Sequence, residues 1–294
     1  DGYVNLIYMC RVFHHFARPR AMLERMFQDL APGGCLVIVD QQKGPLTDWA
    51  SVEQREKHHH WTGETTVVRL AREAGFLFHD VLDDLWHEKQ PFVLVFRKPA
   101  EPAKAAGDPD RPLPLNADAL VKALPPLPAD DAAVVFFGLD QGRAALPELQ
   151  AKLPASARLF DVVIDEWALS REELPPEPRP AGAEIWRTEK GVLSLPTNAA
   201  PGLVLFADAY HRLWNPAPTL RNLKAQMPAS GMVAIVDRQG PEGESRRLAG
   251  HHRRIDSKLV IEDMRQAGFA LRQNLSKPAE DRFFLLFGLA KSNP

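Results

Sequence analysis

The chain has 294 residues, of which 45% are hydrophobic and 25% charged, and its formal net charge at pH 7 is −2. This length suffices for two domains, and the balance of charges argues against the basic stripe of a nucleic-acid-binding surface. No apolar run reaches the length of a membrane span and no signal-peptide pattern opens the chain. We therefore expect neither nucleic acid nor membrane as a partner, and a cytoplasmic location.

The first hundred residues alternate between predicted strands and helices. An apolar run at 4–10 predicts a strand, and His14 and His15 follow it. Apolar residues at helical spacing predict a helix over 22–30. The segment APGGCLVIVD (31–40) predicts a turn and then a strand that is apolar on both faces, which is typical of a parallel sheet covered by helices.

A helix within 58–76 and a strand ending PFVLVFRKP (91–99) complete this part. The two cysteines, Cys10 and Cys35, both fall in strands that are predicted to be buried. We therefore expect both to be core residues of a protein in a reducing compartment. The composition then changes over 100–131, where Pro, Ala and Asp predict a linker with one short helix.

Strands and helices resume after the linker and continue to the end of the chain. The segments are 132–142, 143–153, 158–165, 184–188, 202–208, 220–227, 228–237, 251–269 and 282–290. This alternation predicts an α/β fold with a doubly wound, mostly parallel sheet and a terminal antiparallel strand pair.

The end of the chain also repeats its beginning. The matching segments are 4–19 with 202–216, 22–30 with 220–227, 31–40 with 228–237, and 58–76 with 251–269. A collinear match of this many elements predicts a duplicated domain, with one copy at 1–99 and a second at 132–294. The first copy has no counterpart of 132–165, so we expect it to be the C-terminal half of a domain with an open sheet edge at its first strand.

The motifs DGYVNLIYMCRVFHHF, DLAPGGCLVIVD, EAGF and VLVFRKP make residues 1–99 resemble the second half of a class I S-adenosylmethionine-dependent methyltransferase. Residues 132–294 resemble the same Rossmann-like methyltransferase fold over its full length. The resemblance implies S-adenosylmethionine as the cofactor and a small-molecule methyl acceptor. It places cofactor-binding residues at Gly138, Gly142, Asp165 and Asp208.

The glycine-rich turn of the second copy departs from the pattern of the family. Phe136 stands where an acid is usual, and Asp140 replaces the middle glycine. Asp140 adds a side chain where backbone would approach the cofactor, and its charge repels the cofactor carboxylate. We therefore expect the second domain to bind the cofactor weakly or not at all, and the chain alone to have negligible activity.

Histidines follow equivalent strands of the two copies at the ligand-binding end of the sheet. A histidine can act as a general base because its pKa lies near neutrality, so His14, His15 and His211 are the candidate catalytic residues. The alternative is that they cap or pack a loop. The adjacent histidines at 58–60 and 251–252 lack the spacing of a zinc site, and no metal is expected.

Two functions remain open. The first is methyl transfer to a small molecule, with a non-catalytic second domain. The alternative is a non-enzymatic, methyltransferase-like structural or dimerisation module, for instance in a homodimer. A nicotinamide-dependent dehydrogenase is disfavoured because the glycine turn fits poorly and the strands after AGF follow the methyltransferase pattern.

Overall fold

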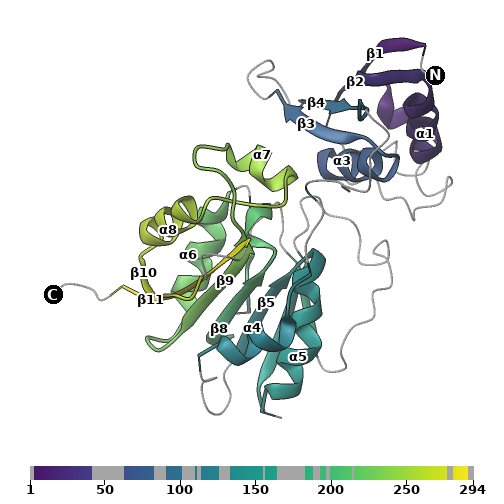
Figure 1. Ribbon diagram of the computed structural model, residues 1–294. Helices are drawn as coiled ribbons and strands as arrows, with labels where there is room; N and C mark the ends of the chain where they lie inside the picture. Colours follow the sequence, from purple (N-terminus) through teal and green to yellow (C-terminus); the bar gives the residue numbers. More distant parts are fainter. Residues whose placement is uncertain are drawn as a thin grey trace. The chain divides into compact units, whose positions relative to one another are not determined.

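In the computed structural model the chain divides into two compact units, the first built mainly from Asp1–Arg111 and the second from Pro112–Glu166 and Glu177–Pro294. Figure 1 shows a sheet with packed helices in each unit. The structure describes residues 3–41, 63–82, 91–100, 110, 114–125, 133–154, 156–163, 183–187, 193–196, 199–213, 215–276 and 281–290.

The second unit contains a seven-stranded sheet in the order β10-β11-β9-β8-β5-β6-β7. The strands are β5 (Ala133–Gly138), β6 (Arg158–Val163), β7 (Ala183–Arg187), β8 (Pro201–Ala207), β9 (Met232–Arg238), β10 (Phe269–Asn274) and β11 (Arg282–Leu289). Strands β5 to β9 pair in parallel, whereas β11 is antiparallel to both β9 and β10. The predicted mostly parallel sheet with a terminal antiparallel pair is confirmed.

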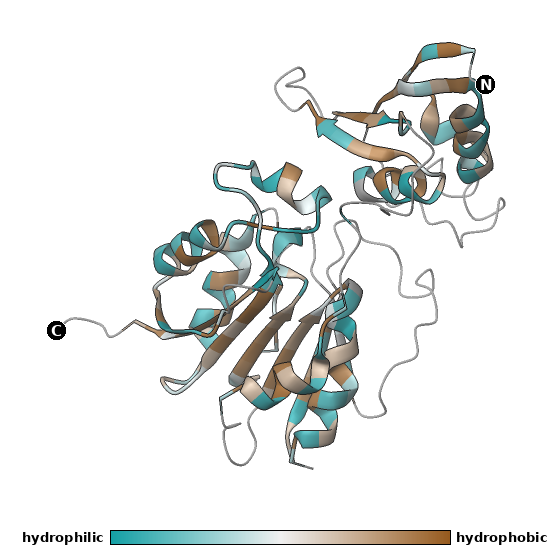
Figure 2. Ribbon diagram, viewed as in Figure 1, coloured by the Kyte–Doolittle hydropathy of each residue, from teal (hydrophilic) through white to brown (hydrophobic). Residues whose placement is uncertain are grey.

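The central strands of this sheet carry apolar side chains on both faces, and helices cover both faces. Every residue of β5 and of β8 is buried. Alternate side chains of β5 enter opposite cores: Val135 and Phe137 lie in one hydrophobic cluster, and Val134 and Phe136 in the other. Figure 2 shows apolar strands between helices whose outer faces are hydrophilic. The strands are therefore the two-sided buried strands that the apolar runs predict.

The described helices of the second unit are α4 (Ala117–Ala123), η3 (Asp140–Ala144), α5 (Ala145–Lys152), η5 (Tyr210–Arg212), α6 (Pro216–Gln226), α7 (Arg246–His251) and α8 (Ser257–Gln266). Helices α5, α6 and α8 overlap the predicted segments, whereas α7 and the short helices η3 and η5 were not predicted. Pro147 lies in the first turn of α5, where its missing N–H costs no hydrogen bond. Helix α4 lies within the range predicted as a linker, but its Leu120 and Val121 are buried in the core of the second unit.

The first unit contains a four-stranded sheet in the order β1-β2-β4-β3. Its elements are β1 (Val4–Cys10), η1 (Phe13–His15), α1 (Pro19–Asp29), β2 (Leu30–Gln41), α3 (Glu64–Glu73), β3 (Leu77–Val81) and β4 (Pro91–Arg97). Strands β1 and β2 are parallel, and β4 is antiparallel to β2 and β3. The order matches β8-β9-β11-β10 of the second unit, strand for strand.

Strand β1 lies at an open edge, since among the described residues it pairs with β2 alone. The predicted edge is thus confirmed, and Leu6 and Tyr8 are 58% and 60% exposed on it. The prediction that both cysteines are buried is wrong. Cys35 is only partly buried, although its strand β2 has a neighbour on each side. Cys10 is exposed, because it lies on β1, and a strand with one neighbour cannot be covered as a central strand is.

Each unit turns sharply between a helix and the strand that follows it. Gly75 follows α3 with φ of +100°, and Gly268 follows α8 with φ of +86°. Such left-handed conformations after a helix end favour glycine, which explains why both units have a glycine in the AGF segment. No described helix combines the length and the hydropathy needed to cross a membrane.

Candidate functional site

In the first unit, a histidine and an aspartate meet at the carboxyl ends of two adjacent parallel strands. His14 lies in η1, directly after β1, and Asp40 lies near the end of β2. The His14 Nδ1 atom is 2.7 Å from Asp40 Oδ1, and the His14 backbone N–H donates to Asp40 Oδ2 at 3.0 Å. Asp40 is fully buried and His14 is 6% exposed.

This geometry fixes which ring nitrogen of the histidine carries the proton. A carboxylate oxygen accepts hydrogen bonds, so Nδ1 of His14 donates, and in the neutral imidazole the lone pair is then on Nε2. An imidazole held in this way is the arrangement of a general base whose orientation a carboxylate controls. His15 is exposed, and its ring centroid lies 4.1 Å from that of His14. The histidine pair therefore offers one buried and one accessible imidazole.

The second unit holds the same pair of residue types in the same geometry. The His211 Nδ1 atom is 2.9 Å from Asp237 Oδ1, and the His211 backbone N–H donates to Asp237 Oδ2 at 3.0 Å. Both residues are buried. Within the described part of the chain, Nε2 of His211 has no hydrogen-bond partner. Arg212 stands at the position that His15 occupies in the first unit.

Sequence reasoning singled out these histidines but did not pair them with the aspartates. A signal was present, since 26 residues separate the partners in both units. The aspartates end the segments 31–40 and 228–237, but neither was named as a candidate site residue. The pairing depends on β1 lying beside β2, and on β8 lying beside β9, which brings the two strand ends together.

The two predicted cofactor-binding glycines lie where the backbone of the second unit is crowded. A Cβ atom on Gly142 would lie 1.9 Å from the carbonyl oxygen of Ala207, at the end of β8. A Cβ atom on Gly138 would lie 2.3 Å from the ring of Phe136. Contacts inside the protein are therefore enough to require glycine at both positions, whatever they contact in addition.

Asp208, one of the two predicted cofactor-binding acids, forms a buried ion pair with Arg282. It has a φ of +48°, and its two carboxylate oxygens accept hydrogen bonds from Nε and Nη2 of Arg282, each at 2.9 Å. Both side chains are buried. Burial raises the pKa of the Asp208 carboxyl, and the hydrogen bonds from Arg282 oppose that rise. Asp165, the other predicted acid, lies outside the described residues.

A second ion pair, formed by a partly buried arginine and a buried aspartate, lies beside the glycine turn. Arg143 in η3 donates from Nη1 and Nη2 to the two oxygens of Asp161 in β6, both at 2.6 Å. Asp161 is fully buried, and it pairs in register with Phe136 of β5. The side chains of Asp161 and Phe136 thus share one face of the sheet. Sequence reasoning missed both this pair and Arg282.

The remaining histidines do not gather into a metal site in the part of the chain that the structure describes. There, no group of three or more His, Cys, Asp or Glu side chains could hold a metal ion. His251 ends α7 and is buried, and His252 follows it. His58, His59 and His60 lie outside the described residues.

The strand order defines the class of fold. Parallel strands continue to β9, and the last strand, β11, then inserts antiparallel between β9 and β10. This is the arrangement of a Rossmann-like class I methyltransferase fold, and the first unit contains the corresponding four strands of it. The sequence comparison agrees, since residues 1–80 match the model of the methyltransferase domain family. The comparison with curated proteins found no match.

Solved structures with a similar fold include several methyltransferases. A SAM-dependent methyltransferase from Aquifex aeolicus is 16% identical, with a TM-score of 0.42, over 60% of this chain and 90% of that one. CalO1, a methyltransferase in calicheamicin biosynthesis solved with SAH bound, is 16% identical, with a TM-score of 0.41, over 59% of this chain and 53% of that one. An O-methyltransferase family 2 protein from Planctomyces limnophilus in complex with apigenin is 13% identical, with a TM-score of 0.41, over 59% and 56%. The chain spans about half the length of the last two.

Proposed function

We propose that the protein acts in S-adenosylmethionine-dependent methyl transfer to a small-molecule acceptor. In this proposal the first unit contributes the catalytic residues, and the second unit is non-catalytic. The observation that carries the proposal is the pair of His14 and Asp40 at the carboxyl ends of parallel strands, where open α/β sheets bind their ligands. The match of residues 1–80 to the methyltransferase domain family supports it.

S-adenosylmethionine supplies an activated methyl group on a sulfonium, and the protein must position the acceptor and remove its proton. We assign the proton removal to Nε2 of His14. Asp40 is the positioning residue, because its hydrogen bonds to the ring and to the backbone of His14 hold the imidazole in one orientation. The exposed His15 beside it marks the side from which an acceptor approaches.

The second unit does not fit the cofactor well. Its buried Phe136 replaces the usual acid, and the Asp208 carboxylate is already engaged by Arg282. A charged pair of that kind would have to break before either residue could bind a ligand, which leaves a buried charge without a partner. We therefore assign this unit a structural role. Calorimetric titration of residues 1–294 with S-adenosylmethionine should show no binding tighter than about micromolar, roughly −8 kcal/mol.

The catalytic part of the proposal is tested with the full protein. S-adenosylhomocysteine release is followed with a panel of small molecules that carry phenolic hydroxyl groups. We expect His14→Asn to lower kcat/KM by about 100-fold, as for the loss of a general base. The matched substitution His211→Asn should leave the rate nearly unchanged. Equal effects of the two substitutions, or an unchanged rate in His14→Asn, would overturn the assignment.

A second candidate function is a non-enzymatic module for association, and the open edge of β1 favours it. Val4, Leu6 and Tyr8 are large apolar residues that are more than a third exposed on this strand. An exposed apolar edge strand pairs readily with another chain. On this hypothesis the chain forms a homodimer through β1, and its methyltransferase fold serves as a scaffold.

The two candidates separate in one sedimentation experiment. A Leu6→Lys substitution places a charge on the edge without touching His14 or Asp40. If association is the function, sedimentation velocity shows a dimer that this substitution converts to a monomer. If the chain is monomeric before and after the change, the association module is excluded, and methyl transfer stands on its own test.

A further inference from the structure

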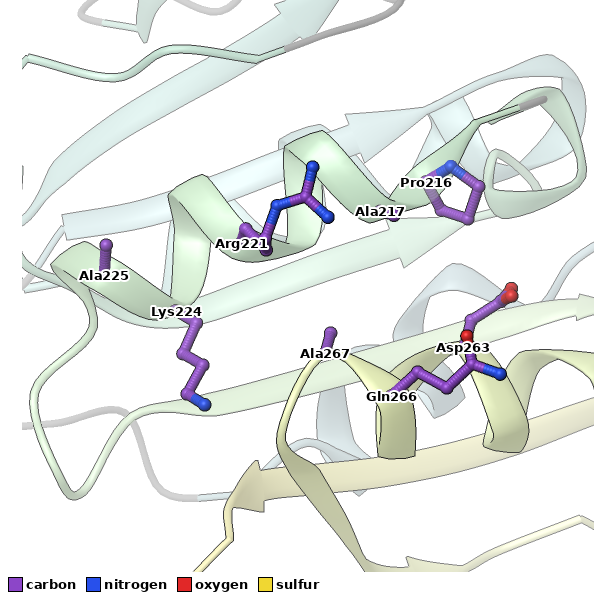
Figure 3. A pocket seen from close by; sticks show the side chains of 8 residues that line it. All are labelled: Pro216, Ala217, Arg221, Lys224, Ala225, Asp263, Gln266 and Ala267. Atoms are coloured by element: carbon purple, nitrogen blue, oxygen red, sulfur yellow. The ribbon is translucent and has the colours of Figure 1, made fainter.

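A groove with a volume of about 600 Å³ lies between α6 and α8 of the second unit. Pro216 and three alanines contribute its apolar lining, and the polar lining consists of Arg221, Lys224, Asp263 and Gln266. Figure 3 shows these side chains along the two helices. A volume of this size falls in the range of small-ligand sites. The groove lies on the helical layer, whereas the histidine–aspartate pair lies at the strand ends.

Two basic residues give the groove its charge. Arg221 and Lys224 are three positions apart on α6 and are therefore neighbours on one face of the helix. Both are exposed, and neither forms an ion pair with any residue that the structure describes. Lys224 extends from α6 toward the end of α8. A Cβ atom on Gly268 would lie 2.1 Å from Lys224 Nζ, so this glycine leaves the space that the ammonium group takes.

The acidic residue in the lining does not cancel this charge. Asp263 accepts a hydrogen bond from the hydroxyl of Tyr210 at 3.0 Å and is ion-paired with Arg246. Burial raises the pKa of its carboxyl, and its charge is already matched by that of Arg246. The Gln266 side chain donates from Nε2 to Glu262 at 2.8 Å. The acidic residue of the lining therefore does not neutralise Arg221 and Lys224, and an anion bound in the groove would do so.

The corresponding surface of the first unit is closed by its own contacts. Helices α1 and α6 both have eleven residues and begin with proline, and Glu24 and Phe27 of α1 take the places of Arg221 and Lys224. Arg20 contacts Glu24 at 3.2 Å and Glu73 of α3 at 3.8 Å. The ring of Phe27 packs edge-on against Phe76, with centroids 5.1 Å apart. The basic groove thus belongs to the second unit alone within the described structure.

We propose that the groove binds a small molecule that carries two anionic groups, either phosphates or carboxylates. Arginine suits this role because its planar guanidinium donates two parallel hydrogen bonds to a phosphate or a carboxylate. Lys224 adds a point charge farther along the groove, toward the end of α8 (Figure 3). The apolar lining can cover the carbon skeleton between the anionic groups. This site is independent of the catalytic role proposed for His14, since it uses none of the same residues.

The test uses residues 1–294 and two probes, pyrophosphate and citrate, in calorimetric titrations at low ionic strength. We expect saturable binding of at least one probe, and the probe that binds more tightly tells phosphate from carboxylate recognition. The double charge reversal Arg221→Glu with Lys224→Glu should weaken binding by tenfold or more, which corresponds to at least about 1.4 kcal/mol. Failure of both probes to saturate would overturn the proposal.

Two further variants separate a built site from general charge attraction. Lys258→Glu reverses one charge, against two in the double variant, near the start of α8 and outside the groove lining, where Lys258 pairs with Glu242 on the surface. It should leave binding unchanged. Ala225→Trp fills the groove without altering charge and should abolish binding while circular dichroism confirms the fold. Equal weakening by Lys258→Glu, or full binding by Ala225→Trp, would show that no groove site exists.

Discussion

The two units place residues of opposite charge in the same backbone conformation, one after β1 and the other after β8. Arg11 has a φ of +55° and Asp208 has a φ of +48°, and each precedes its histidine by three residues. Arg11 is exposed, whereas Asp208 is buried against Arg282. The residue that corresponds to Arg282 at the start of β4 is Pro91, which has no charge to offer.

This difference shows how one fold can keep its geometry and change its chemistry. The histidine–aspartate pair has nearly the same distances in both units, so the strand ends impose it. Within the ranges that the structure describes, only the second unit adds a buried ion pair directly before it. A charged pair formed by two residues far apart in the chain can therefore change the chemistry of a strand end without any change in the strand order.

The largest effect is expected from breaking that ion pair. Arg282→Ala leaves the Asp208 carboxylate buried without its partner, which typically costs about 3–5 kcal/mol. Urea unfolding followed by tryptophan fluorescence should show this loss in the free energy of unfolding. The double variant Asp208→Asn with Arg282→Met should recover most of it. A loss below about 1 kcal/mol in Arg282→Ala would mean that water replaces the guanidinium.

The next largest effect is expected at the turn after β5. Gly142→Ala forces a methyl group against the Ala207 carbonyl and should lower the free energy of unfolding by about 3 kcal/mol, as for a severe case of overpacking. Gly243 has a positive φ but no atom within 4 Å of an added Cβ. Gly243→Ala should therefore cost only about 1 kcal/mol. Equal losses in the two variants would contradict the crowding at Gly142.

A smaller asymmetry is expected between the two aspartates. Asp237 accepts hydrogen bonds from the backbone and ring of His211 and from the backbone of Arg238. Asp237→Asn replaces one acceptor with a donor and should cost about 2 kcal/mol, by the loss of a hydrogen bond to a charged group. Asp40→Asn should cost less, because His14 beside it is slightly more exposed. Thermal unfolding of both variants measures the difference, and a larger loss in Asp40→Asn would reverse the comparison.

The smallest effect concerns the exposed faces of the matched helices α3 and α8. Hydrogen bonds from Arg265 and Gln266 lower the pKa of Glu262 on α8 to about 2. The sixth residue of α3 is Arg69, so this feature has no counterpart there. Carboxyl carbon shifts in an NMR pH titration should show the low pKa. Arg265→Gln should raise it toward the ordinary value, and no change would rule out the ion pair as its cause.

The fold was largely predictable because two strong local signals agree. Apolar runs bounded by glycine and proline marked the strands, and helical spacing marked α1, α6 and α8. The exposure of Cys10 was not predictable, because it depends on which strand lies next to β1. The sequence carries the pattern of a buried strand there, and only the sheet order shows that one neighbour is lacking among the described residues.

The candidate site was predictable only in part. His14 and His211 stood out because they follow apolar runs at equivalent positions. The direction of the Asp208 side chain could not be predicted, because neither glycine nor asparagine marks the left-handed backbone at this position. Arg282 was missed because it begins an apolar strand far from Asp208 in the chain, and no neighbouring residue indicates that it pairs with a carboxylate.

The pairing of the strands has a consequence for the order in which the chain folds. In the first unit, β3 and β4 are consecutive strands, so part of its sheet forms from segments close in sequence. In the second unit, Val134 of β5 pairs with Leu203 of β8, and all of β6 and β7 lies between them in the chain. Parallel pairing between strands far apart in sequence requires a long loop to close, and the entropy cost of that closure precedes the favourable contacts. Such pairing therefore slows folding. We therefore expect the pairing of β5 with β8 to form later in folding than the pairing of strands that are consecutive in the chain.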